Sequence, residues 1–453
     1  MLAPHDKEFP LKKLIAILLI LLIVIFIGAP YFTGKVAETE TMKMVDTIKL
    51  DSENYGDIEV LTYDRGLRST SAKYRYTPPA TLAAMLTSNK PIDYGCESKH
   101  GVLGIDYICH LQGDGAYADF VNEKLDGKDP LSMYGSVSVF GAITQTYEIK
   151  AIQNLDLDGQ TINTPKAQLN IETDNEMTAF KFTGDTEAFQ LDDEEGTLDI
   201  GGINIEGDLE SIATMLFTGS LNVDLDTLSF KDSEEEFTLD KVSFSSITRE
   251  NGDNIDSKGT FKLGSMIAPN GDIKSIENVE LVFEVNGVDT KAYSEYQAFS
   301  MDIQKQAFAT LEAGQEPQID PNAMIAALPI IEKMLKPGLE LNLGVEAELN
   351  GTANEVELEL SLLEALTLAE MSIFITDTEQ ALKKLDIELE TKLSNSFVES
   401  QAMLAVMLGQ SPLIEKTDDN YKLKFSSNKT IQLNGKSITF AELQSMVFGS
   451  LGS

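Results

Sequence analysis

The sequence "GLELNLGVEAELNGTANEVELELSL", residues 338–362, gives the clearest indication of the fold. Apolar and polar residues alternate along it with a period of two, on both sides of the dipeptide Asn350-Gly351. Such alternation is typical of strands that have one buried face and one solvated face. Because Asn-Gly between two such runs is the strongest short-range signal of a hairpin, the stretch predicts two antiparallel strands joined by a tight turn.

The same pattern recurs along much of the chain. Residues 219–230 and 384–393 also alternate, and the pairs Asn286-Gly287 and Asn434-Gly435 predict further hairpin turns. Between about residue 130 and residue 290 there is little helical periodicity. We therefore predict an antiparallel meander over most of the chain.

Helical periodicity is concentrated in the last third of the chain. Apolar residues recur at helical spacing within 293–314, 320–338 and 397–408. Near the C-terminus, Thr439 followed by Glu442 is a capping-box pattern and predicts the start of one more helix. The predicted fold class is therefore α+β and mainly β. It is an elongated antiparallel β-sheet with a few helices, mostly in a C-terminal part at about 293–453, and no firm internal boundary can be drawn.

An uncharged apolar run lies near the N-terminus. As a helix, residues 14–32 would extend about 28 Å, close to the hydrocarbon thickness of a bilayer. Lys12 and Lys13 precede the run and place its N-terminal side in the cytoplasm. We predict a short cytoplasmic segment at 1–13, a transmembrane signal-anchor helix at 14–32 and an ectodomain at 35–453. A cleaved signal peptide is the alternative, but no small-x-small cleavage site follows the run.

The composition is strongly acidic. Asp and Glu number 73 against 35 Lys and Arg, which gives a net charge of −38. Such a charge repels nucleic acid and anionic lipid headgroups, so nucleic-acid binding is not expected. The surplus of acid is most simply explained as a means of keeping the protein solvated, and an acidic docking face is the alternative.

Both cysteines, Cys96 and Cys109, lie in "IDYGCESKHGVLGIDYIC" at residues 92–109. The tripeptide Ile-Asp-Tyr occurs twice there and predicts two short strands that fold back on each other. In an oxidising periplasm the expected state of the cysteines is a structural disulfide. The alternatives are a zinc site that adds His100 and His110, a redox-active pair, and unpaired thiols. The spacing is not Cys-x-x-Cys, and it does not match the usual zinc ligand pairs.

The segment "NLDLDGQT" at residues 154–161 resembles the start of a calcium-binding loop. An EF-hand needs a Glu at its twelfth position, where Pro165 stands instead. A hairpin that turns at Asp158-Gly159 explains the same residues and is favoured over the calcium loop.

Residues suited to catalysis are scarce. In the expected ectodomain the histidines are His100 and His110, both close to the cysteines. The sequence has no Gly-x-Ser-x-Gly nucleophile elbow and no Gly-rich phosphate-binding loop. We therefore expect a protein that is not an enzyme and that uses no cofactor and no metal.

Several stretches resemble the YdgA-like family of Gram-negative envelope proteins. They are "YFTGK" (31–35), "YDRGLRSTSAKY" (63–74) and His100-Gly101, although the Pro-Phe that follows in the family is Val-Leu-Gly here. Residues 327–343 and 431–447 resemble the family's helix–strand junction and its closing hairpin and helix. The resemblance implies a single-pass protein of the bacterial inner membrane with a cytoplasmic N-terminus and a periplasmic ectodomain. It supplies no catalytic residues.

The stretch 63–74 also supplies the candidate binding residues Tyr63, Arg65 and Gly66. The favoured interpretation is structural, with a positive φ at Gly66 and an ion pair between Arg65 and an acidic residue. Binding of a ligand or partner by these residues is the alternative.

Two functions are consistent with the sequence. The first is a non-enzymatic envelope interaction or scaffold protein that forms a homo-oligomer or binds an envelope protein partner. The second is a carrier of lipid or another apolar ligand, held in a groove between the sheet and methionine-rich helices. Both follow from the need to cover the apolar face of a long open sheet with helices, a partner or lipid.

Overall fold

The computed structural model describes residues 29–39, 41–43, 45–46, 49, 56–79, 91–112, 121–157, 160–174, 176, 178–192, 196–213, 216–231, 236–267, 275–312, 321–367, 370, 378–427 and 430–449. The chain forms two compact units, each described by itself below. Unit 1 comprises Met1–Ala151, Gln168–Phe180 and Leu311–Gly314, and unit 2 comprises Ile152–Ala167, Lys181–Thr310 and Gln315–Ser453.

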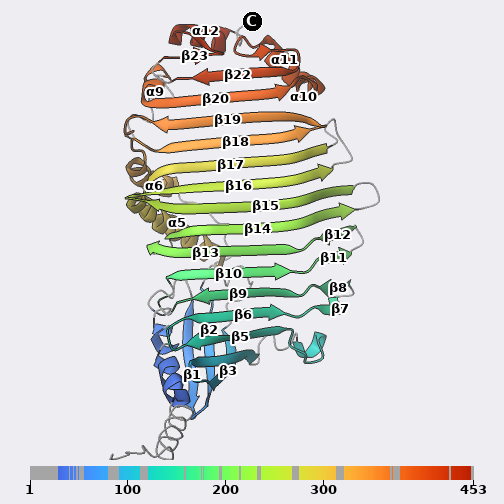
Figure 1. Cartoon of the computed structure of the whole chain (residues 1–453), viewed down its shortest axis with the longest axis vertical. Helices are drawn as coiled ribbons and strands as arrows, with labels where there is room; N and C mark the ends of the chain where they lie inside the picture. The colour runs from blue at the N-terminus through green and yellow to red at the C-terminus, as the bar shows by residue number, and fades with distance from the viewer. Residues whose placement is uncertain are drawn as a thin grey trace, which may run out of the picture. The chain divides into compact units, whose positions relative to one another are not determined.

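Unit 1 is built on an antiparallel meander in which each strand from β1 to β6 pairs with the next (Figure 1). The strands are β1 (Asp57–Arg65), β2 (Ser69–Thr77), β3 (Ile92–His100), β4 (Gly104–Gln112), β5 (Leu131–Ser138), β6 (Ile143–Ile149) and β9 (Ala167–Thr173). Between β6 and β9, Thr146 Oγ1 donates a hydrogen bond of 2.8 Å to Asn170 Oδ1. The strand pair predicted around the two Ile-Asp-Tyr tripeptides is confirmed as β3 and β4.

A β-bulge in β1 decides which side chains share a face of this sheet. The register between β1 and β2 shifts between Val60 and Thr62. One extra residue reverses the side to which the following side chains point. The bulge therefore keeps Ile58 and Val60 on the same face as Tyr63 and Arg65.

A helix that is described from residue 29 packs against the strand meander within unit 1. Its side chains Thr33, Ala37 and Val45 are buried. Thr33 Oγ1 donates a hydrogen bond of 2.8 Å to the carbonyl oxygen of Gly101, in the turn between β3 and β4. The helix is thereby fixed to one end of the strand meander.

The predicted transmembrane helix at 14–32 falls mostly on residues that the structure does not describe. Residues 14–28 and the predicted cytoplasmic segment 1–13 lie outside the described residues, and residues 29–32 are helical. Among the helices that are described, none combines the length and the apolar character needed to cross a membrane.

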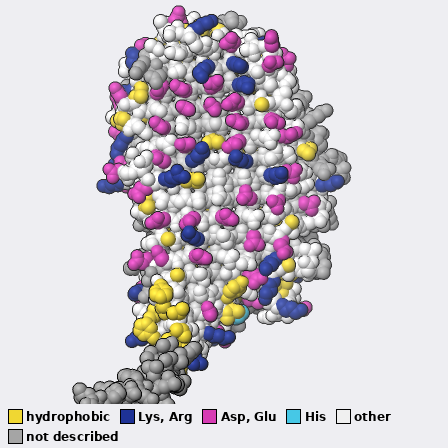
Figure 2. Space-filling model, in the orientation of Figure 1, with side chains coloured by type: hydrophobic (Ala, Val, Ile, Leu, Met, Phe, Trp, Pro, Cys, Tyr) yellow, Lys and Arg dark blue, Asp and Glu magenta, His cyan; other side chains and the backbone are white. Residues whose placement is uncertain are grey.

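Unit 2 is also mainly an antiparallel sheet. From β13 to β20 each strand pairs with the next, and β20 pairs with β22 (Figure 1). The strands are β7 (Ile152–Leu157), β8 (Gln160–Thr164), β10 (Ala179–Thr186), β11 (Phe189–Asp192), β12 (Thr197–Ile200), β13 (Ile203–Ala213), β14 (Leu216–Lys231), β15 (Glu236–Asn251), β16 (Asn254–Ile267), β17 (Ser275–Asp289), β18 (Glu340–Leu349), β19 (Thr352–Leu362), β20 (Leu385–Ser394), β21 (Glu415–Lys416), β22 (Asn420–Ser426), β23 (Gln432–Leu433) and β24 (Lys436–Ser437). Acidic and basic side chains are spread over the face of unit 2 that is in view in Figure 2.

Two of the predicted Asn-Gly turns are confirmed. Asn350 (φ 49°) and Gly351 (φ 78°) join β18 to β19, and Asn434 (φ 50°) and Gly435 (φ 77°) join β23 to β24. Positive φ at both central residues is the turn geometry whose twist matches that of a hairpin. The strands predicted on either side of Asn350-Gly351 are therefore present, and Leu349 pairs with Thr352 next to the turn.

The hairpin turn predicted at Asn286-Gly287 is wrong. Both residues lie inside β17, and Asn286 pairs with Glu340 of β18. Gly287 has a φ of 76°, and a Cβ at this position would overlap the carbonyl oxygen of Gly338. The glycine therefore permits a close approach of two backbone segments rather than a reversal of the chain.

The hairpin favoured for residues 154–161 is confirmed. β7 and β8 form a separate two-stranded antiparallel sheet, in which Asp156 pairs with Thr161. The turn residues 158–159 lie outside the described residues.

Most helices of unit 2 were predicted. The helices are α5 (Thr290–Glu312), α6 (Pro321–Met334), α9 (Thr378–Lys384), α10 (Asn395–Ser400), α11 (Ala402–Gln410) and α12 (Phe440–Gly449). The single helix expected at 397–408 is divided at Gln401, whose φ of −110° and ψ of 91° are extended. The capping box is confirmed, because Glu442 accepts from the backbone N–H of Thr439 at 2.7 Å and Thr439 Oγ1 accepts from that of Glu442 at 3.2 Å.

Candidate functional site

A cavity of about 570 Å³ lies on one face of the β1–β6 sheet of unit 1. Side chains at alternate positions of all these strands line it, together with Thr41 and Val45 of the N-terminal helix. The period of two places every second side chain of a strand on this face. The bulge in β1 adds Tyr63 to the same lining.

Tyrosines form much of the wall, and we therefore name the cavity the tyrosine pocket. Those among the described lining residues are Tyr63, Tyr74, Tyr76, Tyr94, Tyr107 and Tyr147. Tyr74 and Tyr94 stand opposite each other on β2 and β3, and their rings stack with centroids 5.4 Å apart and planes inclined by 24°. Stacking at this separation is favourable between aromatic rings beyond their burial alone.

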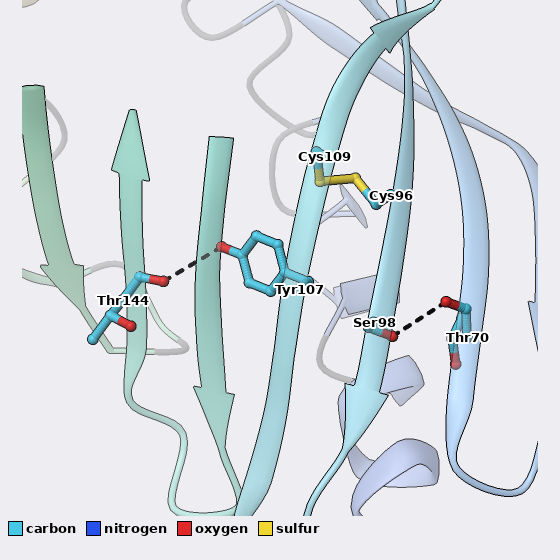
Figure 3. Close-up of a disulfide and its surroundings, with 6 residues drawn as sticks. All are labelled: Thr70, Cys96, Ser98, Tyr107, Cys109 and Thr144. Atoms are coloured by element: carbon cyan, nitrogen blue, oxygen red, sulfur yellow. Dashed lines mark hydrogen bonds between the residues drawn. A yellow bond between two sulfur atoms is a disulfide. The ribbon is translucent and has the colours of Figure 1, made fainter. Parts of the chain in front are cut away.

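Tyr107 extends across β5 toward Thr144 (Figure 3). A glycine on β5 leaves room for its ring. Its partner in register is Gly135, where a Cβ would lie 2.7 Å from the hydroxyl oxygen of Tyr107. Tyr107 Oη donates a hydrogen bond of 3.4 Å to the carbonyl oxygen of Thr144 on β6. This partner satisfies the hydroxyl and holds the ring as part of the wall.

The described wall of the pocket consists mainly of neutral side chains. Burial raises the pKa of all six tyrosines above the ordinary 10.0, and it raises the pKa of Tyr94 to about 12. The hydroxyls are therefore neutral at physiological pH. None of the described lining residues is Lys, Arg, Asp or Glu. The pocket is chemically suited to an apolar molecule rather than to an ion.

The predicted disulfide is confirmed and belongs to the pocket wall (Figure 3). Cys96 and Cys109 stand opposite each other on β3 and β4 with their Cα atoms 4.0 Å apart. The bond joins the two central strands of the pocket face. Because both sulfur atoms are used in this bond, the alternatives of a zinc site and of unpaired thiols do not apply here. In the described part of the chain no His, Cys, Asp and Glu side chains group as metal ligands would.

The candidate binding residues Tyr63, Arg65 and Gly66 have different surroundings. Tyr63 lines the pocket. Arg65 Nε lies 2.9 Å from a carboxylate oxygen of Glu38 on the N-terminal helix, and its guanidinium lies over the ring of Tyr31 at 4.9 Å from the centroid. Arg65 therefore holds helix and sheet together, as the structural interpretation expects.

Gly66 differs from the prediction of a positive φ. The glycines with positive φ do not include it. Its backbone N–H donates a hydrogen bond of 2.8 Å to the carbonyl oxygen of Ser69, which closes the turn between β1 and β2. A Cβ at Gly66 would lie 3.1 Å from that oxygen, so the tight turn favours glycine by its lack of a side chain.

His100 lies at the end of the pocket face, between the N-terminal helix and β2. Its Nε2 is 2.8 Å from Thr70 Oγ1, and a Cβ on Gly34 would overlap its ring. Burial is the main cause of the lowered pKa of His100. Three of the stretches that carry the sequence resemblance, at 31–35, 63–74 and 100–101, thus meet at one end of unit 1.

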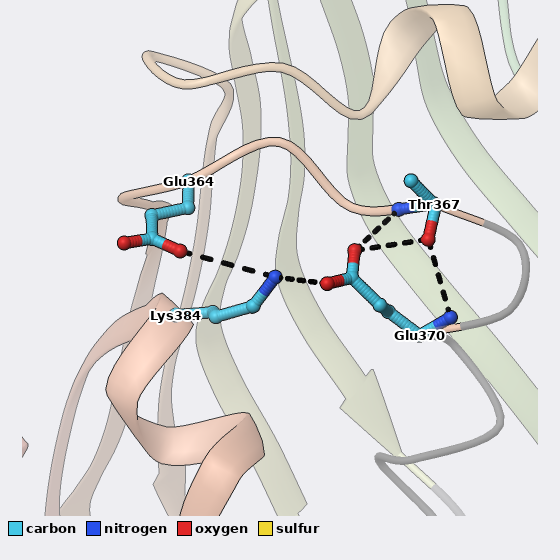
Figure 4. A network of polar contacts seen from close by, with 4 residues as sticks. All are labelled: Glu364, Thr367, Glu370 and Lys384. Atoms are coloured by element: carbon cyan, nitrogen blue, oxygen red, sulfur yellow. Dashed lines mark hydrogen bonds and ion pairs between the residues drawn. The ribbon is translucent and has the colours of Figure 1, made fainter.

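A perturbed carboxylate in unit 2 has a structural explanation (Figure 4). Glu370 accepts hydrogen bonds from Lys384 Nζ at 2.6 Å and from the backbone N–H and hydroxyl of Thr367 at 3.0 and 2.9 Å. These bonds, the one from Lys384 first, lower the pKa of Glu370 to about 2. The carboxylate is fully engaged in fixing the loop after β19, and we assign it no chemical role.

The sequence reasoning found Tyr63 and the cysteines but missed most of the pocket. Tyr94 and Tyr107 occur in the repeated Ile-Asp-Tyr, which predicts two strands but not that they form the wall of a cavity. The methionine-rich helices expected to line a groove supply none of the described lining residues. A signal was present in "STSAKYRYT" (69–77), where Tyr74 and Tyr76 alternate with charged residues.

Fold and site together define a mainly β, antiparallel protein whose unit 1 encloses an uncharged pocket. A family model described as "Bacterial protein of unknown function (DUF945)" matches residues 11–441, and the chain belongs to this family. No curated protein and no solved structure matches the chain.

Proposed function

We propose that this protein binds an acyl chain of a lipid in the tyrosine pocket of unit 1. The observation that carries the proposal is the uncharged wall, in which the described lining residues are tyrosines, aliphatic residues and the disulfide, with His110 and a few small polar side chains. The volume of about 570 Å³ falls in the range of small-molecule sites, about 300–1,000 Å³.

The length of the pocket also suits an acyl chain. On β2 the lining extends from Thr70 to Tyr76, which at about 3.3 Å per residue corresponds to roughly 20 Å. Half of a bilayer's hydrocarbon core is about 15 Å thick, and this thickness is set by acyl chains. An extended chain therefore fits along the strands without leaving the apolar wall.

We propose the same location that the sequence predicts, a bacterial inner membrane with the ectodomain in the periplasm. The apolar run at 14–32 and the resemblance to YdgA-like envelope proteins support it. The disulfide supports it as well, because such bonds persist in oxidising compartments. An inner-membrane position would give the pocket direct access to lipid.

The test uses the full chain in cells supplied with a fatty acid that carries a photoreactive diazirine. After irradiation, mass spectrometry of the purified protein maps the adduct to a peptide. We expect adducts on peptides of β2 to β4, and the adduct mass distinguishes a phospholipid from a free fatty acid. Adducts absent from these strands would contradict the proposal.

A matched pair of variants makes the test specific. Ala72 is buried in the pocket wall opposite Cys96, so Ala72→Leu places extra volume inside the cavity. The same change at the exposed strand residue Ala179 does not touch the pocket. We expect Ala72→Leu to reduce the adduct several-fold and Ala179→Leu to leave it unchanged, with the disulfide formed in both.

A second candidate function, the scaffold that binds another protein, is favoured by a different feature in unit 2. Phe244, Phe261 and Leu281 stand in one row across β15, β16 and β17, and all three are exposed. A contiguous exposed apolar row is typical of an interaction surface.

A photoreactive amino acid in place of Phe261 would identify the contact of this row. The matched control is the same residue in place of Lys262, whose side chain points to the other face of the sheet. A protein adduct, from a second copy or another protein, at position 261 and not at 262 supports the scaffold. A lipid adduct or no adduct at 261 counts against it.

A further inference from the structure

Three hairpin turns at one end of unit 1 expose large apolar side chains. Leu67 lies between β1 and β2, Leu103 between β3 and β4, and Phe140 between β5 and β6. Their exposed fractions are 52%, 66% and 87%. Turns are usually occupied by Gly, Pro, Asn, Asp and Ser, so apolar residues in three neighbouring turns call for an explanation.

The turns form one connected surface. The backbone N–H of His100 donates to the carbonyl oxygen of Arg68 at 2.8 Å, and that of Val139 donates to the carbonyl oxygen of Leu103 at 3.0 Å. These bonds join the first turn to the second and the second to the third. The exposed side chains are therefore held on a fixed framework and not on independent loops.

The N-terminal helix adds to the same surface. Thr33 is hydrogen-bonded to Gly101 in the second turn, and the neighbouring Phe32 is 63% exposed. We name the residues Phe32, Leu67, Leu103 and Phe140 the apolar end of unit 1. Apolar side chains gather over the lower part of unit 1 in Figure 2.

The chain that precedes the apolar end is itself apolar. Residues 14–28, which lie outside the described structure, contain no charged residue and lead directly into the helix that carries Phe32. A long apolar segment thus ends where the four exposed side chains of the apolar end begin. This continuity points to one common environment for both.

From this arrangement we propose that the apolar end inserts into the surface of a lipid bilayer. The contact is apolar rather than electrostatic, because a net charge of −38 gives no attraction to anionic headgroups. Aromatic residues such as Phe32 and Phe140 are suited to the boundary between hydrocarbon and headgroups. The proposal concerns the hairpin turns and does not depend on what the tyrosine pocket binds.

The chain contains no tryptophan, so a single introduced tryptophan reports on its own surroundings. The test places Phe140→Trp in the full chain and reconstitutes it in vesicles of phosphatidylcholine and phosphatidylglycerol, with and without bromine on the acyl chains. The matched control is Ile149→Trp, at the other end of β6 and 43% exposed. The β6 strand separates the two positions by roughly 20 Å.

Bromine quenches tryptophan only on contact. We expect bromolipid to quench Phe140→Trp strongly and to leave Ile149→Trp almost unchanged. Leu103→Trp, in the neighbouring turn, is expected to behave as Phe140→Trp does. Equal quenching at both ends, or no quenching at either turn, would overturn the proposal. The proposal would also be overturned if the tryptophan emission changed on dilution of the protein but not with bromolipid. That result would mean that the apolar end contacts a second copy of the chain.

Discussion

His100 shows how one side chain couples the helix of unit 1 to its sheet. The ring is buried against Gly34 and lies within hydrogen-bond distance of Thr70. Its pKa is lowered from 6.5, mainly by burial and in part by the nearby charge of Arg65. In the folded chain the imidazole therefore stays neutral at a pH where the unfolded chain is already protonated.

We expect acid to destabilise unit 1 through this residue. As the pH falls through 6.5 the unfolded chain binds more protons than the folded chain, so the free energy of unfolding decreases until the lowered folded pKa is passed. His100→Asn removes the titration. The measurement is the thermal unfolding midpoint of wild type and variant at pH 7.5 and pH 5.5, about one unit either side of the ordinary pKa. The midpoint of the variant should fall less between these two pH values than the midpoint of wild type. An equal loss in both would contradict this role of His100.

The contact between Gly34 and His100 gives a second prediction at the scale of residues. A Cβ at Gly34 overlaps the imidazole ring, and such overpacking typically costs about 1–3 kcal/mol. Gly34→Ala should therefore destabilise unit 1, although alanine favours the helical backbone. The control is Gly409→Ala in α11, where a Cβ meets nothing within 4 Å. That change should be neutral or stabilise by up to about 1 kcal/mol.

Hydrogen exchange measured by mass spectrometry separates the two glycine variants. Gly34→Ala should accelerate exchange in β3, next to His100, and Gly409→Ala should not accelerate exchange in α11. Unchanged exchange in β3 of Gly34→Ala would show that the helix accommodates the methyl group and that the tight contact has no energetic importance.

The pocket residues could be predicted from the sequence only in part. The alternation around Tyr74 and Tyr76 shows that these side chains share a face of a strand. It does not show that this face encloses a cavity, because the same alternation is typical of any strand with one buried and one solvated face. The enclosure depends on the helix that carries Val45 and on the bulge after Val60, neither of which the local pattern reveals.

At the scale of elements, the disulfide joins β3 to β4 in the middle of the pocket face. The two cysteines are 13 residues apart in sequence, and closing a loop of this size stabilises the folded state by about 3 kcal/mol in the chain-entropy model. We expect the double change of Cys96 and Cys109 to alanine to lower the free energy of unfolding of unit 1 by up to this amount. Reduced wild-type protein is the control and should match the variant.

Hydrogen exchange of the β3 and β4 amides measures this loss directly. If neither the variant nor the reduced protein exchanges faster than oxidised wild type, the strand pairing alone stabilises the pair. The same experiment on β18 and β19, which have no disulfide, should show no difference between the proteins.

Elements were predictable where the signal is local. The alternation and the Asn-Gly turn at 350–351 predict β18 and β19, and the capping box predicts the start of α12. Both signals depend only on residues that are close in sequence. Asn286-Gly287 carries the same dipeptide signal and is not a hairpin. At Gly287 the deciding contact is with Gly338, about 50 residues away in the sequence. The dipeptide alone therefore cannot predict it.

At the scale of the whole molecule, the net charge of −38 acts against folding by self-repulsion. The sheet of unit 2 even places like charges opposite each other. Glu346 of β18 stands between Glu280 of β17 and Glu355 of β19. The ends of this row are compensated, because Lys262 lies 3.1 Å from Glu280 and Lys392 stands opposite Glu355. In this row the charge of Glu346 is the one without a lysine opposite it.

Glu346→Gln should therefore stabilise unit 2. Like charges directly opposite each other on a sheet are destabilising, with cross-strand terms of about 0.2–1 kcal/mol, and the glutamine removes two such pairs. The gain should be largest at low salt and should vanish near 1 M salt, where charges are screened beyond about 3 Å. The matched control is Glu399→Gln. Because Glu399 lies 3.0 Å from Lys416, removing its charge should not increase the stability of the protein. Denaturant unfolding of the full chain at low and high salt measures both variants. A loss of stability in Glu346→Gln at low salt would mean that Glu346 makes a net favourable interaction in the row. A gain that salt does not reduce would mean that the gain does not come from relief of charge repulsion.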